Sequence, residues 1–179
     1  MIILLCGKSA AGKDTYQKKI IRLDPYYYVL PIISYTTRPM RVGEKNGEEY
    51  HFVNKKRFHE LNQEGLFIEV RHYEVLRNGE KDVWSYGSPK VDLSMAEYVG
   101  IVDLDGVKSY IKEYGSENIE VFYIYADDDV REERAKKRGS FDKAEWDRRL
   151  EDDDEKFSEE NLKEIEDLLG KKITYINNN

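Results

Sequence analysis

The stretch MIILLCGKSAAGKDT, residues 1–15, decides the fold of this chain. Its apolar start predicts a buried strand, and the glycine-rich segment that follows has the layout of a phosphate-binding P-loop. Gly7 and Gly12 permit backbone angles that other residues resist, so successive N–H groups can point into one concavity. Lys13 can place its charge on terminal phosphates, and a helix beginning near Thr15 adds its positive N-terminus. The stretch predicts a nucleotide phosphate site.

Composition bounds the remaining possibilities. The chain has 179 residues, 40% of them hydrophobic, which suits one core with inserted subdomains. The net charge is −7, with clustered arginines and spread acids, so we expect no nucleic-acid partner. Cys6 is the single cysteine, which excludes an intrachain disulfide and suits a reducing compartment. No apolar run is long enough to cross a bilayer, and no secretory signal precedes the P-loop. We expect a cytoplasmic protein without a membrane partner; its oligomeric state is left open.

Apolar runs that alternate with helical patterns predict one α/β domain over 1–179 with a parallel sheet. Its core is expected from three segments, 1–33, 91–126 and 155–179. Their elements are a helix 14–22, a strand 29–34, a strand 98–105, a helix 106–114, a strand 119–125 and a strand 172–176.

Residues 34–90 are predicted to form an inserted subdomain. Its first part is polar and rich in Gly and Pro, which indicates a surface segment. Asn54 can cap a helix that runs to about Gln63 with Phe58 and Leu61 inward, and a short strand is expected at 66–68.

Residues 127–154 are predicted to form a helical lid, because two charged helices flank a basic crook. The second helix is expected to begin near Asp142. The acidic run 151–155 is interpreted as a solvated helix face, since five consecutive acids cannot all face one metal ion.

The segment 36–52 resembles the signature of guanylate kinases. Eight positions have that family's spacing: Thr36, Thr37, Arg38, Arg41, Glu44, Gly47, Tyr50 and Phe52. The likeness continues at the P-loop, Ser34 and residues 67–69, 86–88, 102–106, 137–139 and 149–150. It implies a P-loop kinase fold, with a parallel core sheet flanked by helices, an inserted monophosphate-binding subdomain and a lid. It also implies transfer of the γ-phosphoryl of ATP to GMP or dGMP, giving ADP and GDP, with Mg²⁺.

The residues of the expected acceptor site suit that chemistry. Two guanidinium groups and two phenols can hold a phosphate monoester. The Glu69 carboxylate can accept from the ring N–H and amino group of guanine, while the Ser34 hydroxyl can donate to O6. Resemblance adds the second acid of the Asp-x-Asp pair. The expected GMP-binding residues are Ser34, Arg38, Arg41, Tyr50, Glu69, Tyr86, Ser88 and Asp105.

The resemblance implies that the P-loop and the lid form the site for the phosphoryl donor. The expected ATP-binding residues are Gly7, Ala10, Ala11, Gly12, Lys13, Asp14, Thr15, Arg134 and Arg138. Lys13, Arg38, Arg138 and Arg149 are expected to act in catalysis, and Asp14 and Asp103 near Mg²⁺. A monophosphate is largely anionic at neutral pH, so the reaction needs no general base.

Three features depart from the family pattern. Asp14 stands where a hydroxyl normally meets Mg²⁺, about eight extra residues lie between Glu69 and Tyr86, and two are missing after Asp105. The acceptor could therefore be another (deoxy)nucleoside monophosphate. Ribose bisphosphate is a further alternative, because kinases of that sugar have a similar Gly-Lys-Asp loop.

A non-catalytic binding module, similar to the guanylate kinase-like domains of scaffold proteins, is the alternative from another class. Those domains typically degrade the P-loop, whereas Gly7, Gly12 and Lys13 are present here together with the lid arginines. The enzyme is the favoured hypothesis.

Overall fold

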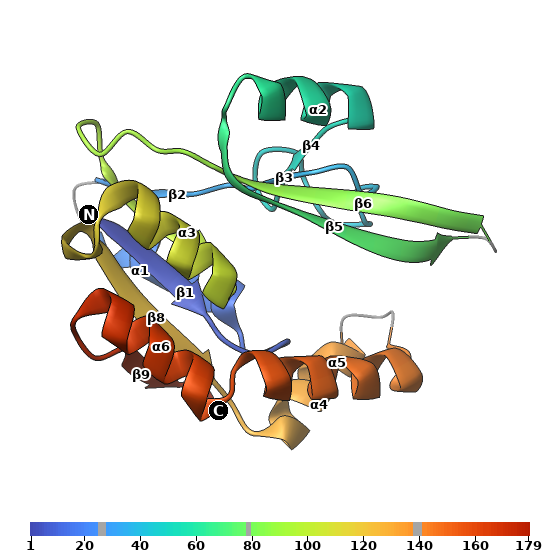
Figure 1. The fold of residues 1–179 in the computed structure, drawn as a ribbon. Coiled ribbons are helices and arrows are strands. Elements are labelled where there is room, and N and C mark those ends of the chain that lie inside the picture. Colours follow the sequence, from blue (N-terminus) through green and yellow to red (C-terminus); the bar gives the residue numbers. More distant parts are fainter. Residues whose placement is uncertain (25–27, 78–79, 138–140) are drawn as a thin grey trace. The chain divides into compact units, whose positions relative to one another are not determined.

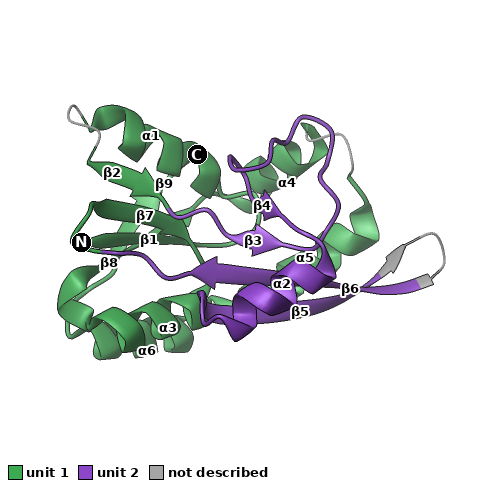
Figure 2. Ribbon diagram, turned by 90° about the horizontal axis from the view of Figure 1, so that it is seen from above, with its two compact units in different colours: residues 1–31, 93–179 green, residues 32–92 purple. Residues whose placement is uncertain are grey.

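The computed structural model describes residues 1–24, 28–77, 80–137 and 141–179 (Figure 1). They form two compact units, residues 1–31 with 93–179, and residues 32–92 (Figure 2). The segment 127–154, expected as a lid, belongs to the first unit.

The first unit is built on a five-stranded sheet in the order β2-β7-β1-β8-β9. Its strands are β1 (Ile2–Cys6), β2 (Val29–Pro31), β7 (Glu97–Ile101), β8 (Ile119–Tyr125) and β9 (Thr174–Asn177). All four pairings are parallel, as predicted. In β1 every residue but Ile3 is fully buried, which explains why a central strand covered on both faces reads as one apolar run.

Helices cover both faces of this sheet (Figure 2). On one face lies α1 (Lys13–Leu23), whose Tyr16 and Ile20 pack against the buried Leu5 and Val99. On the other face, α3 (Leu104–Tyr114) packs against α6 (Glu159–Leu169), with a short 3-10 helix (Ser116–Asn118) after α3.

Two further helices follow β8, namely α4 (Asp128–Lys137) and α5 (Lys143–Lys156). The Asp142 side chain caps α5 by accepting from the Glu145 N–H, at the start that the sequence predicts. Ser158 then caps α6. No helix in the described part of the chain is both long and apolar enough to span a membrane.

The second unit holds a four-stranded sheet in the order β4-β3-β6-β5 and one helix. Its elements are β3 (Tyr35–Thr36), β4 (His51–Phe52), α2 (Lys55–Gln63), β5 (Phe67–Arg77) and β6 (Glu80–Pro89). Asn54 caps α2, and Phe58 and Leu61 are buried against Phe67, as predicted.

Three strand predictions were wrong in length. The strand expected over 98–105 ends at Ile101, because Asp103 caps α3 and the helix begins at Leu104. The short strand expected at 66–68 is the 11-residue β5, because the extra residues before Tyr86 lengthen an antiparallel β5–β6 hairpin. The strand expected over 29–34 stops at Pro31, since residues 32–34 already belong to the second unit.

A bulge sets the direction of the hairpin's side chains. The register shifts between Phe67 and Glu69, so one extra residue lies on β5. Phe67 and Val70 both pack in the α2 cluster, while Glu69 pairs with Ser88 of β6. A Cβ at Gly87 would lie 2.8 Å from the Phe67 ring, so this position requires glycine. The bulge thus presents Glu69 on the face away from α2.

Candidate active site

The P-loop joins β1 to α1 through residues in unusual backbone conformations. Gly7 has φ 140° and Gly12 φ 94°, and Ala10 has φ 58° although it is not glycine. A Cβ on Gly7 would lie 2.1 Å from the Ile124 carbonyl oxygen of β8. Steric exclusion by the neighbouring strand therefore explains the first glycine, and the left-handed backbone explains the second.

Lys13, the first residue of α1, folds back over the loop. Its Nζ donates to the carbonyl oxygens of Gly7 (2.7 Å) and Lys8 (3.0 Å). Burial lowers the pKa of Lys13, and the negative charge of Asp14 partly opposes that shift. The loop thus holds the Lys13 amino group at the carboxyl end of the central strand.

The neighbouring Cys6 reports on the same charges. Burial raises the pKa of its thiol to about 12, with Lys13 acting to lower it and Asp103 acting to raise it. Lys13 and Asp103 therefore both act electrostatically at the end of β1. Such a thiol stays protonated and is an inert core group.

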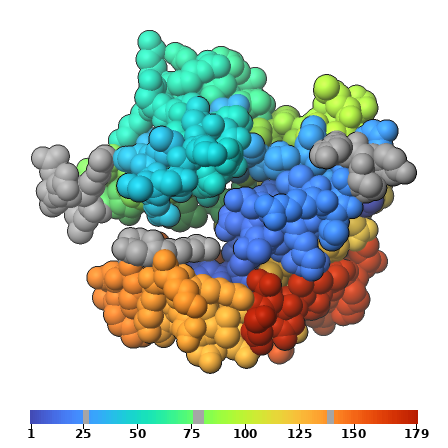
Figure 3. Space-filling view, turned by 180° about the vertical axis from the view of Figure 1, so that it is seen from behind, coloured from blue at the N-terminus to red at the C-terminus, as the bar shows by residue number. Residues whose placement is uncertain are grey.

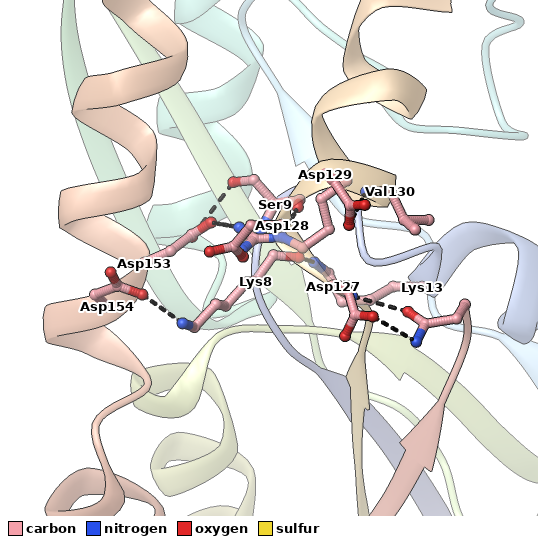
Figure 4. Close-up of polar contacts among 11 residues, drawn as sticks. Lys8, Ser9, Lys13, Asp127, Asp128, Asp129, Val130, Asp153 and Asp154 are labelled. Atoms are coloured by element: carbon pink, nitrogen blue, oxygen red, sulfur yellow. Dashed lines mark hydrogen bonds and ion pairs between the residues drawn. The ribbon is translucent and has the colours of Figure 1, made fainter.

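The α4 and α5 helices contact the loop from outside (Figure 4). The Asp153 carboxylate accepts from the Ser9 N–H (2.7 Å) and from Arg131 Nη2 (2.8 Å). Arg131 Nε also donates to the Ser9 carbonyl oxygen (2.8 Å). Beside them Lys8 forms an ion pair with Asp154.

The C-terminal residues lie on the loop's other flank. Asn178 Nδ2 donates to the Ala11 carbonyl oxygen (2.8 Å), and Arg134 Nη2 donates to the Asn178 carbonyl oxygen (2.7 Å). In the view from behind, the red C-terminal segment lies beside the blue N-terminal one (Figure 3). Arg134 is therefore anchored near the loop.

The expected metal and base acids lie at the start of α3. Asp103 caps this helix by accepting from the Gly106 N–H (3.0 Å), and Asp105 is exposed in its first turn. Both line a cavity of about 240 Å³ with Asp152 and Glu155 of α5. Within the described ranges, no three His, Cys, Asp or Glu side chains are grouped to hold a metal ion.

Asp14 and Thr15 are both exposed on the first turn of α1. Of the lid arginines, Arg149 donates to Glu145 (2.8 Å) on the surface of α5. Hydrogen bonds from Arg148 and Arg149 lower the Glu145 pKa to about 2. Arg138 lies outside the described residues.

In the second unit, Arg38 is only 4% exposed. Its guanidinium donates to both carboxylate oxygens of Glu44 (2.7 and 2.5 Å). The rings of Tyr50 and Phe52 lie 5.1 and 5.2 Å from its Cζ. The hydrogen bonds from Arg38 hold the pKa of Glu44 below its usual value. The expected phosphate arginine is thus oriented by a carboxylate and two rings.

The two expected phenols are neighbours. The ring centroids of Tyr50 and Tyr86 are 5.8 Å apart, and Tyr73 lies 5.6 Å from Tyr86. Arg41 is exposed, and its backbone N–H donates to Glu44 (2.7 Å). Arg38, Tyr50 and Tyr86 are therefore linked through ring contacts.

Glu69 is held by two donors. The Ser88 hydroxyl (2.9 Å) and Arg71 Nη2 (2.8 Å) both donate to its Oε1. Arg71 pairs with Tyr86 in the hairpin register, two pairs along from Glu69 and Ser88 and so on the same sheet face. Ser34 is partly buried, and its carbonyl oxygen accepts from the His51 N–H (2.9 Å). One sheet face thus carries Ser88, Glu69 and Tyr86.

Sequence reasoning missed three charged residues that contact the candidate sites: Arg71, Arg131 and Asp153. For Arg71 a signal existed, because residues two apart on a strand share a face with Glu69. The acidic run 151–155 was interpreted as a solvated face, which is wrong for Asp153 since it is 8% exposed. No local pattern distinguishes it from its acidic neighbours.

Comparisons with known proteins identify the family of this chain. The family model described as guanylate kinase matches residues 1–160. The chain belongs to the guanylate kinase family. This confirms the family that the 36–52 signature indicates.

Relatives and a solved structure extend this match. The guanylate kinase of Nostoc sp. is 40% identical over 72 residues, which are 40% of this chain and 35% of that relative. The match to the Aliivibrio fischeri guanylate kinase likewise spans 40% of that relative. The Prochlorococcus marinus guanylate kinase is 31% identical over 144 residues, 78% of this chain and 72% of that relative. The crystal structure of guanylate kinase from Anaplasma phagocytophilum superposes with a TM-score of 0.60 at 21% identity, covering 99% of this chain and 76% of that one. This likeness shows the fold.

Proposed function

We propose that this protein transfers the γ-phosphoryl group of ATP to GMP or dGMP. The observation that carries the proposal is the sheet face of the second unit. There a carboxylate held by Ser88 is followed along the hairpin by Tyr86, and ring contacts connect Tyr86 through Tyr50 to Arg38. This face offers an acceptor for a base at one end and donors for a phosphate at the other.

Base selection follows from the carboxylate. Guanine presents a ring N–H and an amino group on one edge, and an ionised Glu69 can accept from both. Adenine has no ring N–H there, so AMP would leave a carboxylate oxygen without a partner, at a cost of about 1–3 kcal/mol. The contacts from Ser88 and Arg71 fix the direction of the carboxylate. This arrangement favours guanine.

The phosphate end supports a monophosphate acceptor. A planar guanidinium can bind two phosphate oxygens, and Arg38 is already oriented by Glu44 and the Tyr50 ring. Arg41 is exposed and adds a second cation. Because the acceptor phosphate is largely ionised at neutral pH, it attacks without a general base.

On the donor side, the P-loop N–H groups would hold the ATP phosphates and Lys13 would neutralise charge on the transferring group. Arg134, Arg138 and Arg149 would gather further charge there. Mg²⁺ bound to ATP would supply charge neutralisation between the β- and γ-phosphates. Such an ion takes one or two carboxylates plus phosphate oxygens, which suits Asp14 and Asp103 as its protein contacts. Movement of 34–90 and 127–154 over the nucleotides would exclude water.

A cytoplasmic location suits a protein that uses ATP and keeps its lone cysteine buried. A coupled assay for ADP release tests the proposed activity. GMP, dGMP, AMP, CMP, UMP and ribose bisphosphate are compared side by side at equal concentration, with and without ATP. The proposal expects the guanine nucleotides to be phosphorylated fastest. Equal rates with GMP and AMP would contradict the base assignment, and no turnover with any acceptor would favour a binding module.

A further inference from the structure

We propose that Arg131 and Asp153 are positioning residues of the donor loop, and that they set its affinity for ATP. The proposal rests on the proposed function, in which ATP binds at this loop. Neither residue belongs to the expected nucleotide site, and both come from the helices α4 and α5 that follow β8.

Arg131 and Asp153 form hydrogen bonds with both polar backbone groups of one loop residue, Ser9. The Ser9 N–H donates to Asp153 Oδ2 (2.7 Å), and the Ser9 carbonyl oxygen accepts from Arg131 Nε (2.8 Å). The two side chains are joined to each other at 2.8 Å. Ser9 Oγ adds a weaker contact to Asp153 (3.3 Å). Figure 4 shows the Asp153 side chain directed at Ser9.

Because peptide groups are planar, these hydrogen bonds also set the direction of the neighbouring loop groups. In a planar trans peptide the C=O and N–H groups point in opposite directions. Holding the Ser9 N–H toward Asp153 turns the Lys8 carbonyl away, and that carbonyl accepts from Lys13 Nζ (3.0 Å). Holding the Ser9 carbonyl toward Arg131 turns the Ala10 N–H away from α4. The pair therefore orients one anchor of Lys13 and one of the loop's N–H donors.

The burial of the pair argues for positioning over stabilisation. The Arg131 side chain is 1% exposed and that of Asp153 is 12% exposed. Arg131 also contacts Asp128 (2.5 Å), and its Cζ lies 5.7 Å from the Trp146 ring. Removing two charges from water costs free energy that apolar side chains of similar volume would not cost, so such a pair is weak evidence for stability. What it provides here is a defined direction for two loop peptides.

The test measures ATP affinity by titration calorimetry in variants of the full chain. Asp153→Ala alone removes one of the two carboxylates that pair with the buried Arg131 charge, which by itself can destabilise the protein. The informative variant is therefore the double replacement Arg131→Leu with Asp153→Ala. It removes both charges, and its melting temperature should stay close to that of the unmutated protein. We expect it to bind ATP about tenfold more weakly, because two oriented charge-assisted hydrogen bonds are lost. In steady state, KM for ATP should rise while KM for GMP stays unchanged.

The control is Asp147→Ala, which removes an acid from the same helix. Asp147 pairs with Lys143 on the surface of α5, at 52% exposure. This variant should bind ATP as the unmutated protein does. A double variant that folds and keeps full ATP affinity would overturn the proposal and leave the pair a structural role.

Asp153→Asn keeps the test decisive if the double variant does not fold. Asparagine retains an oxygen that can face the Ser9 N–H, so ATP affinity should fall by no more than about threefold, against about tenfold for Asp153→Ala. Equal losses in the two would contradict the positioning role. If the unmutated protein binds ATP but phosphorylates no acceptor, the proposed function fails while this comparison still decides the role of the pair. If it does not bind ATP, both fail.

Discussion

Among the described residues, each unit buries one arginine against a carboxylate, and the two arginines differ in where their partners come from. Arg38 meets Glu44, Tyr50 and Phe52, all within one segment of the second unit. Arg131 in the first unit meets Asp153 of a different helix and Ser9, 122 positions away. The partners of Arg38 are therefore close to it in sequence, whereas those of Arg131 come together with it only when the chain folds.

The difference extends to what each arginine can do. Arg38 lies between the aromatic rings of Tyr50 and Phe52, and the Glu44 carboxylate orients it. It lies beside the face that we propose binds a phosphate. Arg131 donates hydrogen bonds to Asp128, Asp153 and the carbonyl oxygen of Ser9 in the loop. We therefore propose that Arg38 meets a ligand and that Arg131 holds the loop that meets one. The following predictions test this contrast.

The largest effect is expected at the loop itself. Lys13→Ala should lower turnover by at least on the order of 10²-fold, because it removes a preorganised charge from the transferring phosphoryl group. Circular dichroism should show that the variant is folded. Unchanged steady-state rates would revive the binding module.

Arg38→Ala should impair the use of GMP without changing the binding of ATP. We expect KM for GMP to rise by about tenfold to a hundredfold, since a bidentate charge-assisted contact to phosphate is lost, with ATP affinity retained. Lys45→Ala is the matched control, because Lys45 is an exposed cation of the same segment paired with Glu48. A loss of ATP affinity equal to the loss for GMP would show that the units do not act separately.

Glu69→Gln sharpens the acceptor side. An amide can accept at only one of the two guanine donors, so KM for GMP should increase about tenfold while ATP binding stays nearly intact. Comparison of GMP with AMP in both proteins is the measurement. The variant should lose preference between the two bases; a preserved preference would remove Glu69 from the base site.

The Arg38–Glu44 contact should also appear in the pH dependence of stability. Arg38 depresses the pKa of Glu44 below its ordinary 4.5. A depressed folded-state pKa gives stability that is present above the unfolded pKa and lost as pH falls through the folded one. Glu44→Gln should therefore cost about 1 kcal/mol of unfolding free energy at neutral pH, and this difference should shrink as pH falls below 4.5. Urea unfolding between neutral and acid pH measures it, and a constant difference would contradict the contact.

The smallest effect is expected at Asp14. A carboxylate close to the ATP phosphates is tolerable when a divalent cation screens it, so Asp14→Ser should improve metal-free ATP binding by about threefold. Calorimetry with Mg²⁺ and with a chelator, in both proteins, is the measurement. Equal metal dependence would mean that Asp14 points away from the phosphates, with Thr15 the better candidate for contact.

Much of the fold could be predicted because it depends on short-range patterns. Buried parallel strands read as apolar runs, and β1 and β8 lie where the sequence places them. Asn54 and Asp142 cap the predicted helices because a capping side chain needs only the N–H groups two or three residues away. The lengths of β5 and β6 were not predicted, because they depend on the pairing of the two strands across the hairpin.

The candidate site divides along the same line. The sequence by itself determined the P-loop and the family, because glycine angles and motif spacing are local properties. Tertiary structure alone decided that Asp153, one acid among five, is buried on the loop with Arg131. It also decided that a bulge directs Glu69 toward Ser88. These contacts join residues far apart in the chain, and their free energy is realised only when packing removes the charges from water.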